Sequence, residues 1–253
     1  VKPKRETNAK NVARNIVLGR GFSVDGVTPW AWKGPVYPLL TALFVIFFGD
    51  AVIFQRIFMV LLDLLCIPLI MKLGERLFRP RVGFIAGLIW AFYVPSIWLA
   101  LMLNYEVVTT WLLLATLCLL FFKGWGHLRW AAVSGLILSL TTLCRASTLL
   151  LGPFLVLFGI FHVKRNREVL QKLCLFAFFS LLGVLPWTVR NYQRFHVLIP
   201  AALSGAPSLL WGSEKKFLTA TREKNARVAL RLETMGFKLS DEPIQRARQL
   251  ERA

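Results

Sequence analysis

Long apolar runs separated by short polar connections dominate the chain between residues 51 and 189. A membrane-spanning helix needs about 20 mainly apolar residues. Runs of about this length predict six spans, at residues 51–72, 82–103, 106–122, 130–146, 148–163 and 173–189. The fourth and fifth are so close together that they also fit one bent segment. The pattern therefore predicts an all-α integral membrane protein, built as a polytopic helical bundle.

A shorter apolar run, residues 35–48, precedes the first predicted span. As a helix it covers only about 20 Å, less than the roughly 30 Å hydrocarbon core. We interpret it as an interfacial or re-entrant helix; a seventh span, placing residues 1–34 in the cytoplasm, is the alternative. The predicted parts are an extracytoplasmic first loop with this juxtamembrane helix (1–50), a transmembrane bundle (51–190) and an extracytoplasmic C-terminal segment (191–253).

Basic residues are concentrated in alternate connections of the predicted bundle. Ten of the fourteen Lys and Arg residues between positions 51 and 211 fall in three clusters, at 72–81, 123–129 and 164–172. Short connections rich in Lys and Arg face the cytoplasm. All three clusters agree on one orientation, which places both ends of the chain outside the cytoplasm. The chain begins at Val1 without Met or a signal-peptide pattern, and we expect a longer protein with a preceding membrane helix.

Composition supports a membrane protein and argues against a nucleic-acid partner. Hydrophobic residues make up 56% of the chain and the mean hydropathy is +0.58, so a soluble fold would expose large apolar patches. The net charge of +18 suggests nucleic acid at first. Its basic residues instead lie in short clusters between apolar runs, and no nucleic-acid-binding motif is present. The four cysteines all lie inside apolar runs without CxxC spacing, which is typical of small core residues.

Ionisable groups at membrane depth are costly and therefore mark candidate functional residues. Arg56 and Asp63 are seven residues apart, on one helix face and two turns from each other. They form either a buried polar tie between helices or, for Arg56 above all, a contact to a ligand. Glu106 follows Asn104 and Tyr105 at the outer mouth of a span. Its carboxylate fits a base, a metal ligand or a group that orients an attacking hydroxyl, but a helix N-terminus favours an acid by itself.

Arginines recur at the same outer level. Arg145 interrupts an apolar stretch, and Arg190 with Asn191 follows the last span. Guanidinium groups bind phosphate with paired hydrogen bonds, so several together indicate an anionic lipid headgroup; snorkelling to the interface explains any single one. The three histidines are scattered and predict no metal ligand set. No P-loop, nucleophile elbow or HExxH motif is present.

Several stretches, in order, resemble the polyprenyl-phosphate-sugar-dependent type C membrane glycosyltransferases. The similarity is to the branch of dolichyl-phosphate-mannose-protein mannosyltransferase-like proteins and lipid A aminoarabinose transferases. It rests on ARNIVLGRGF at 13–22, WKGPVYPLL at 32–40, GERLF at 74–78, RVG at 81–83, Glu106, Arg145 and PWTVRNY at 186–192.

The resemblance implies a fold and a chemistry. A sugar carried on a polyprenyl phosphate would pass, with inversion, to a hydroxyl or phosphate of a lipid, glycan or protein acceptor. Arg56, Arg145 and Arg190 would hold the donor phosphate, with Asp63, Asn104, Tyr105 and Asn191 as supporting polar groups. The catalytic acids would be Glu106 and Glu6; Arg5 stands where the family has the first acid of an Asp-Glu pair, and Glu6 matches the second.

The resemblance also implies a bacterial inner membrane, with the active site facing the periplasm. It leaves open whether a divalent metal assists. The alternatives are a lipid or sugar transporter or flippase, a structural membrane protein, and a family member that has lost its activity. A transporter is expected to contain broken mid-membrane helices or inverted halves.

Overall fold

The computed structural model describes residues 4–124, 127–162 and 167–203. This part of the chain is helical, with no strand. Its elements are α1 (Lys4–Val17), α2 (Val36–Phe48), α3 (Val52–Leu77), α4 (Pro80–Ala91), α5 (Val94–Leu101), α6 (Tyr105–Leu119), the π-helical turn η1 (Leu120–Gly124), α7 (Leu128–Cys144), the 3₁₀ turn η2 (Ala146–Leu150), α8 (Leu151–His162), α9 (Arg167–Leu182) and α10 (Leu185–Phe195). Most of the expected C-terminal segment 191–253 lies outside the described residues.

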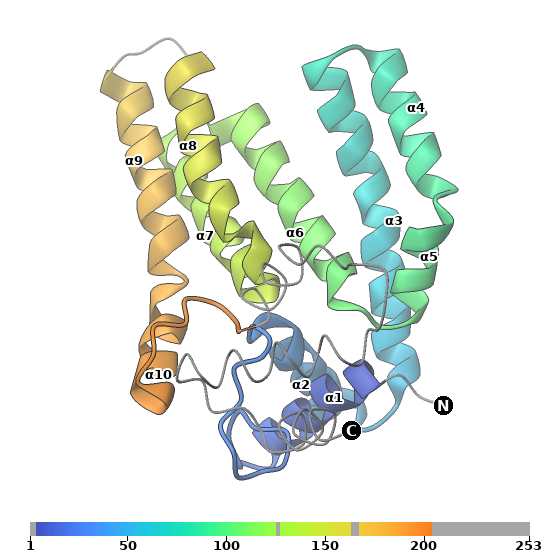
Figure 1. Cartoon of the computed structure of the whole chain (residues 1–253). Coiled ribbons are helices and arrows are strands. Elements are labelled where there is room, and N and C mark those ends of the chain that lie inside the picture. The colour runs from blue at the N-terminus through green and yellow to red at the C-terminus, as the bar shows by residue number, and fades with distance from the viewer. Residues whose placement is uncertain (1–3, 125–126, 163–166, 204–253) are drawn as a thin grey trace, which may run out of the picture.

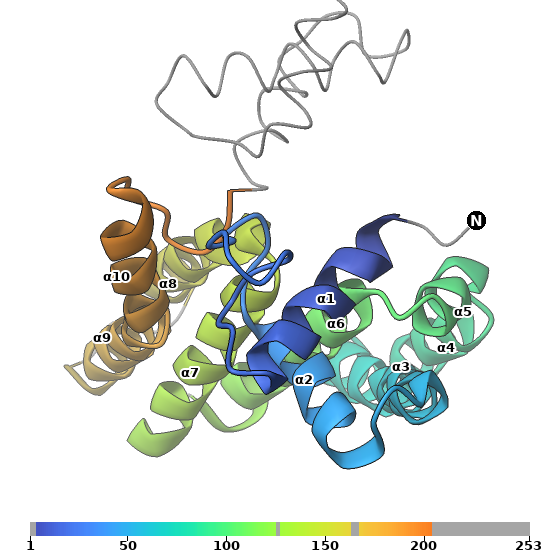
Figure 2. The same ribbon diagram turned by 90° about the horizontal axis from the view of Figure 1, so that it is seen from below.

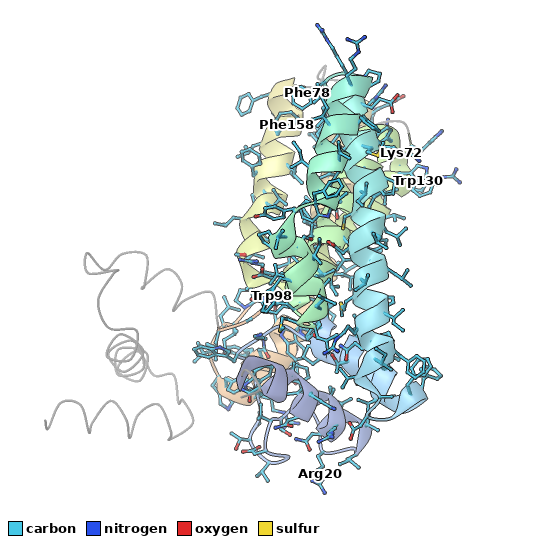
Figure 3. All side chains as sticks on the ribbon, turned by 90° about the vertical axis from the view of Figure 1, so that its right-hand side faces the viewer. Arg20, Lys72, Phe78, Trp98, Trp130 and Phe158 are labelled. Carbon is cyan, nitrogen blue, oxygen red and sulfur yellow. The ribbon has the colours of Figure 1, made fainter. Side chains whose placement is uncertain are left out.

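The bundle has two unlike ends (Figure 1). Helices α1, α2 and α10 and the loop between α1 and α2 gather at the lower end, where α6 begins and α7 ends. Figure 2 shows α1 and this loop lying across that end of the bundle. The turn between α3 and α4 lies at the opposite end, where Phe78 and Lys72 are found, far from Arg20 (Figure 3). The fold class predicted from the sequence is therefore confirmed: an all-α membrane bundle.

The number of spans differs from the six expected. Three helical stretches of the described chain are long and apolar enough to cross a membrane: Val52–Leu77, Tyr105–Phe122 and Arg167–Phe195. A fourth is the pair α4 and α5, which is bent by 50°. The expected fourth and fifth spans correspond to the shorter apolar helices Leu128–Cys144 and Ala146–Phe161. By length, the described residues thus contain three or four spans.

Proline explains where two of the predicted spans break. Pro95 and Pro186 each occupy the first turn of a helix, α5 and α10. A proline lacks the backbone N–H and disfavours helical geometry in the residue before it, so a new helix readily starts there. The expected span 82–103 is therefore two helices joined at Phe92-Tyr93, and the last span continues past a break at Gly183-Val184.

The expected short helix at 35–48 is present as α2. It ends at Gly49, whose φ of 60° suits glycine. One side of α2 is buried against the protein, whereas Leu43, Ile46 and Phe47 are exposed. This exposed apolar side is the one that would contact lipid.

Glycines allow two pairs of long helices to touch backbone to backbone. A Cβ on Gly83 of α4 would lie 2.2 Å from the Met71 carbonyl oxygen of α3, and one on Gly135 of α7 would lie 2.5 Å from the Phe176 carbonyl oxygen of α9. Membrane helices associate largely through such close packing of small residues. The α3–α4 and α7–α9 pairs thus depend on the absence of a side chain at these positions.

An ion-pair cluster joins α1 to the end of α2. Asp50 pairs with Arg14 and, at 3.2 Å, with Lys10. Hydrogen bonds from Arg14 and then from Lys10 lower the pKa of Asp50, so this carboxylate stays ionised at neutral pH. The apolar side of α1, with Ala9, Val12 and Ala13, is buried. The helix that carries Glu6 is therefore fixed to the bundle.

We expect Gly135→Ala to destabilise the protein by about 1–3 kcal/mol, because the new methyl group overlaps the α9 backbone. Gly152→Ala is the matched control: its Cβ would meet the Leu138 side chain at 3.5 Å, an ordinary contact. Thermal unfolding of both variants in detergent measures the difference. Equal unfolding temperatures would contradict the role given to the α7–α9 contact.

Candidate functional site

The start of α6 and the end of α7 meet at the lower end of the bundle. Asn104 caps α6, and its side chain accepts a hydrogen bond from the Glu106 backbone N–H at 3.4 Å. The hydroxyl of Thr109 donates to the Cys144 sulfur at 3.2 Å. The two helices are thus joined next to Glu106 and Arg145, slightly further into the bundle.

Glu106 and Arg145 form an ion pair across these two helix ends. Arg145 Nη1 donates to Glu106 Oε1 at 2.9 Å, and Arg145 Nε donates to the Ser147 hydroxyl at 3.1 Å. The side chains are 32% and 44% exposed, so both remain accessible from outside the bundle. The structure therefore brings together two residues that the sequence analysis proposed separately.

Lys33 is a third ionisable side chain here, and the sequence analysis did not single it out. Its Nζ lies 4.3 Å from the centre of the Tyr105 ring. The next residue, Gly34, is pressed against the end of α7: a Cβ there would lie 1.8 Å from the Leu143 carbonyl oxygen. This contact places Lys33 beside the start of α6, which carries Glu106, and the end of α7, which Arg145 follows. The signal that could have found it is a lysine directly before a glycine in a motif already noted.

The turn between α5 and α6 is held by two side chains from other segments. Arg56 Nε donates to the Leu101 carbonyl at 3.1 Å, and the Tyr37 hydroxyl donates to the Leu103 carbonyl. Leu103 has a φ of 53°, a left-handed conformation that is uncommon for leucine. Arg56 is exposed and fixes the turn that precedes Asn104. Its binding of a donor phosphate stays a prediction.

Asp63 lies about 10 Å further along α3 than Arg56. Its carboxylate accepts a hydrogen bond from Ser96 of α5, which is an interhelical tie of the kind considered from the sequence. Asp63 also lines a pocket of about 230 Å³ together with Trp90, beside the break between α4 and α5. Asp63 therefore belongs to the α3–α5 contact and not to the Glu106–Arg145 pair.

Arg190 and Asn191 belong to a separate cluster on α10. Arg190 is half-buried and donates to the carbonyl oxygens of Trp30 and Phe22, at 3.1 and 3.4 Å. Asn191 is fully buried and donates to the Ile199 carbonyl at 3.0 Å. The predicted binding of phosphate by Arg190 is not tested by these contacts and stays a prediction.

The remaining candidates are placed only in part. Glu6 lies in α1, but its side chain is outside the described residues, as is that of His162. Among the residues that the structure describes, no group of three His, Cys, Asp or Glu side chains is arranged to hold a metal ion. Cys66 and Cys144 are buried, as expected for core residues, whereas Cys174 is exposed on α9.

Fold and site together define a polytopic helical membrane protein with acidic and basic groups collected at one end of its bundle. A family model, described as dolichyl-phosphate-mannose-protein mannosyltransferase, matches residues 32–189, more than half of the chain. The chain belongs to this family and is a glycosyltransferase of the mannosyltransferase type, as the resemblance implied. No curated protein and no solved structure matches it at a significant level.

We expect the Glu106–Arg145 pair to contribute little to stability. Partly exposed ion pairs are worth about 0.2–1 kcal/mol because water and salt screen them. Unfolding of Glu106→Gln, Arg145→Gln and the double variant in detergent should give a coupling free energy below about 1 kcal/mol. A coupling of about 3 kcal/mol would indicate a desolvated structural pair instead.

Proposed function

We propose that this protein transfers a sugar from a polyprenyl-phosphate donor to a hydroxyl or phosphate group of a lipid, glycan or protein acceptor. The observation that carries the proposal is the arrangement of Lys33, Arg145 and Glu106 at one end of a membrane bundle. Two cations and one carboxylate on neighbouring backbone segments are the charges that such a transfer needs. Membership of the mannosyltransferase family supports this reading.

The donor phosphate would bind between Lys33 and Arg145. Guanidinium and ammonium groups both bind phosphate oxygens. Here they lie at the lower end of the bundle, where the phosphate of a lipid-linked donor would be at the membrane surface. A phosphate that approaches Arg145 competes with Glu106 for its N–H groups. Donor binding would therefore release the Glu106 carboxylate from the ion pair.

The released carboxylate can then act on the acceptor. The acceptor oxygen attacks the anomeric carbon, its proton passes to the carboxylate, and the bond between that carbon and the phosphate oxygen breaks. Lys33 and Arg145 stabilise the negative charge that develops on the leaving phosphate. A single displacement of this kind inverts the configuration of the sugar. Glu6 is the second proposed acid, on the basis of the motif alone.

We also propose that this end of the molecule faces away from the cytoplasm, toward the periplasm of a bacterial inner membrane. The support is the position of Lys72 and of the turn between α3 and α4, at the opposite end of the bundle from the start of α6, which carries Glu106 (Figures 1 and 3). Basic clusters beside membrane spans remain on the cytoplasmic side. The exposed apolar side of α2 would then lie in the outer leaflet.

Membranes containing the full-length protein should transfer label from a radiolabelled polyprenyl-phosphate sugar pool to an acceptor. We expect Glu106→Gln to reduce the transfer rate about 100-fold or more, because the loss of a general base removes a factor of about 10²–10⁴. Glu6→Gln tests the second acid. The matched control is Glu75→Gln: Glu75 is an exposed acid near the C-terminal end of α3, at the opposite end of the bundle from Glu106, and this variant should retain full activity.

Absence of transfer by the wild-type protein with every donor tried would overturn the proposed activity and favour a transporter or an inactive family member. Full activity of Glu106→Gln, with loss of activity in Glu6→Gln, would move the role of base to α1.

The orientation is tested by cysteine labelling in a variant whose four native cysteines are replaced. Val27→Cys and Phe78→Cys place thiols at sites that are 87% and 71% exposed, at opposite ends of the molecule. A membrane-impermeant maleimide should label position 27 in intact spheroplasts, and position 78 only after the membrane is permeabilised. The reverse pattern would invert the proposed topology.

A further inference from the structure

The contacts of Arg190 point to a role that differs from phosphate binding. Among the described residues, its hydrogen-bond acceptors are the carbonyl oxygens of Trp30, Phe22 and the Asn191 side chain. The guanidinium carbon also lies 4.6 Å from the Trp187 ring and 5.4 Å from the Phe22 ring. Nη1 and Nη2 of this group are thus engaged by the protein itself, and two aromatic rings lie against it.

The segment that Arg190 holds is the one that leads to Lys33. Phe22 and Trp30 close a loop: the Trp30 N–H donates to the Phe22 carbonyl at 3.0 Å, and their rings stack. Arg190 contacts both closing residues. Lys33 follows Trp30 by three positions. The position of Lys33 therefore depends on where Trp30 is anchored.

A second contact fixes the same segment from α10. The side chains of Trp187, Thr188 and Asn191 each donate to a backbone carbonyl of the stretch after the helix, at 2.8, 2.9 and 3.0 Å. That stretch in turn donates from the Leu203 N–H to the Ala31 carbonyl at 2.9 Å. Trp30 and Ala31 are therefore both tied to α10, and Gly34 is seated against α7.

We propose that Arg190 is a positioning residue for the donor site: it fixes the first outer loop to α10 and so holds Lys33 over Tyr105, beside Arg145. This inference rests on the proposed function in one respect, the binding of donor phosphate by Lys33. The chemistry of arginine fits the role. Its planar fork reaches two carbonyl groups at once, and its faces stack on aromatic rings, which a lysine ammonium cannot do in the same way.

The test compares Arg190→Lys, which keeps the charge but loses the fork, with Arg194→Lys, an exposed control on the same helix. Two quantities are measured on the full-length protein in detergent or nanodiscs. Amide hydrogen exchange reports on residues 20–34, with α3 and α4 as an internal reference. Steady-state transfer gives KM for the polyprenyl-phosphate sugar and kcat separately.

We expect exchange in residues 20–34 to become about tenfold faster in Arg190→Lys, since a lysine can replace only one of the two charge-assisted hydrogen bonds to the loop carbonyls. Exchange in α3 and α4 should not change, which shows that the bundle is folded. KM for the donor should rise several-fold. Because Arg190 is proposed to act through Lys33, adding Lys33→Ala to Arg190→Lys should raise KM little further. Arg194→Lys should change neither quantity.

Unchanged exchange together with a raised donor KM would overturn the inference and assign Arg190 to the phosphate itself. Faster exchange with an unchanged KM would overturn it as well, because the loop would then be loosened without effect on the donor. A wild-type protein that transfers no sugar would refute the proposed function; exchange is read without activity and separates that failure from a failure of the loop contact.

Discussion

In lipid there is no hydrophobic driving force between apolar helix surfaces. Close backbone packing and polar contacts at helix ends must therefore hold this bundle together. The glycine contacts of α7 with α9 and of α3 with α4 meet this constraint within the bundle. At the lower end, Gly34 meets it in another way, since it lets a loop rest directly on the last turn of α7. The position of Lys33 follows from that contact.

The sequence predicted the helical class, the short helix α2 and the family, because apolar run length and motif order are local properties. It overestimated the number of full spans for a physical reason. Apolar composition reports the solvent around a helix, not its length or continuity. It did not show that the helices Leu128–Cys144 and Ala146–Phe161 are shorter than a full span, and the breaks at Phe92-Tyr93 and Gly183-Val184 were hidden inside apolar runs. The prolines that follow each break, Pro95 and Pro186, were the visible signal.

Individual residues of the site could be predicted from the sequence, but most of the contacts between them could not. Glu106 and Arg145 were found separately, as charges out of place beside apolar runs, but their pairing depends on how α6 packs on α7. Lys33 was missed because a lysine in a polar loop carries no cost that would mark it. Arg190 was found for its charge, although its contacts are with backbone carbonyls and aromatic rings, which no spacing in the sequence reveals.

The unequal helix lengths affect the surrounding bilayer. Helix α3 has 26 residues and α7 has 17, or about 39 Å against about 26 Å at 1.5 Å per residue. A long helix is accommodated by tilting, whereas a short one is accommodated by thinning of the lipid beside it, by snorkelling of its flanking residues or by oligomerisation. Thinning beside α7 would compress the hydrocarbon layer on that side of the molecule. Because Arg145 directly follows α7, headgroups in such a depression would lie closer to its guanidinium than headgroups elsewhere. A membrane that resists thinning would make this approach more costly.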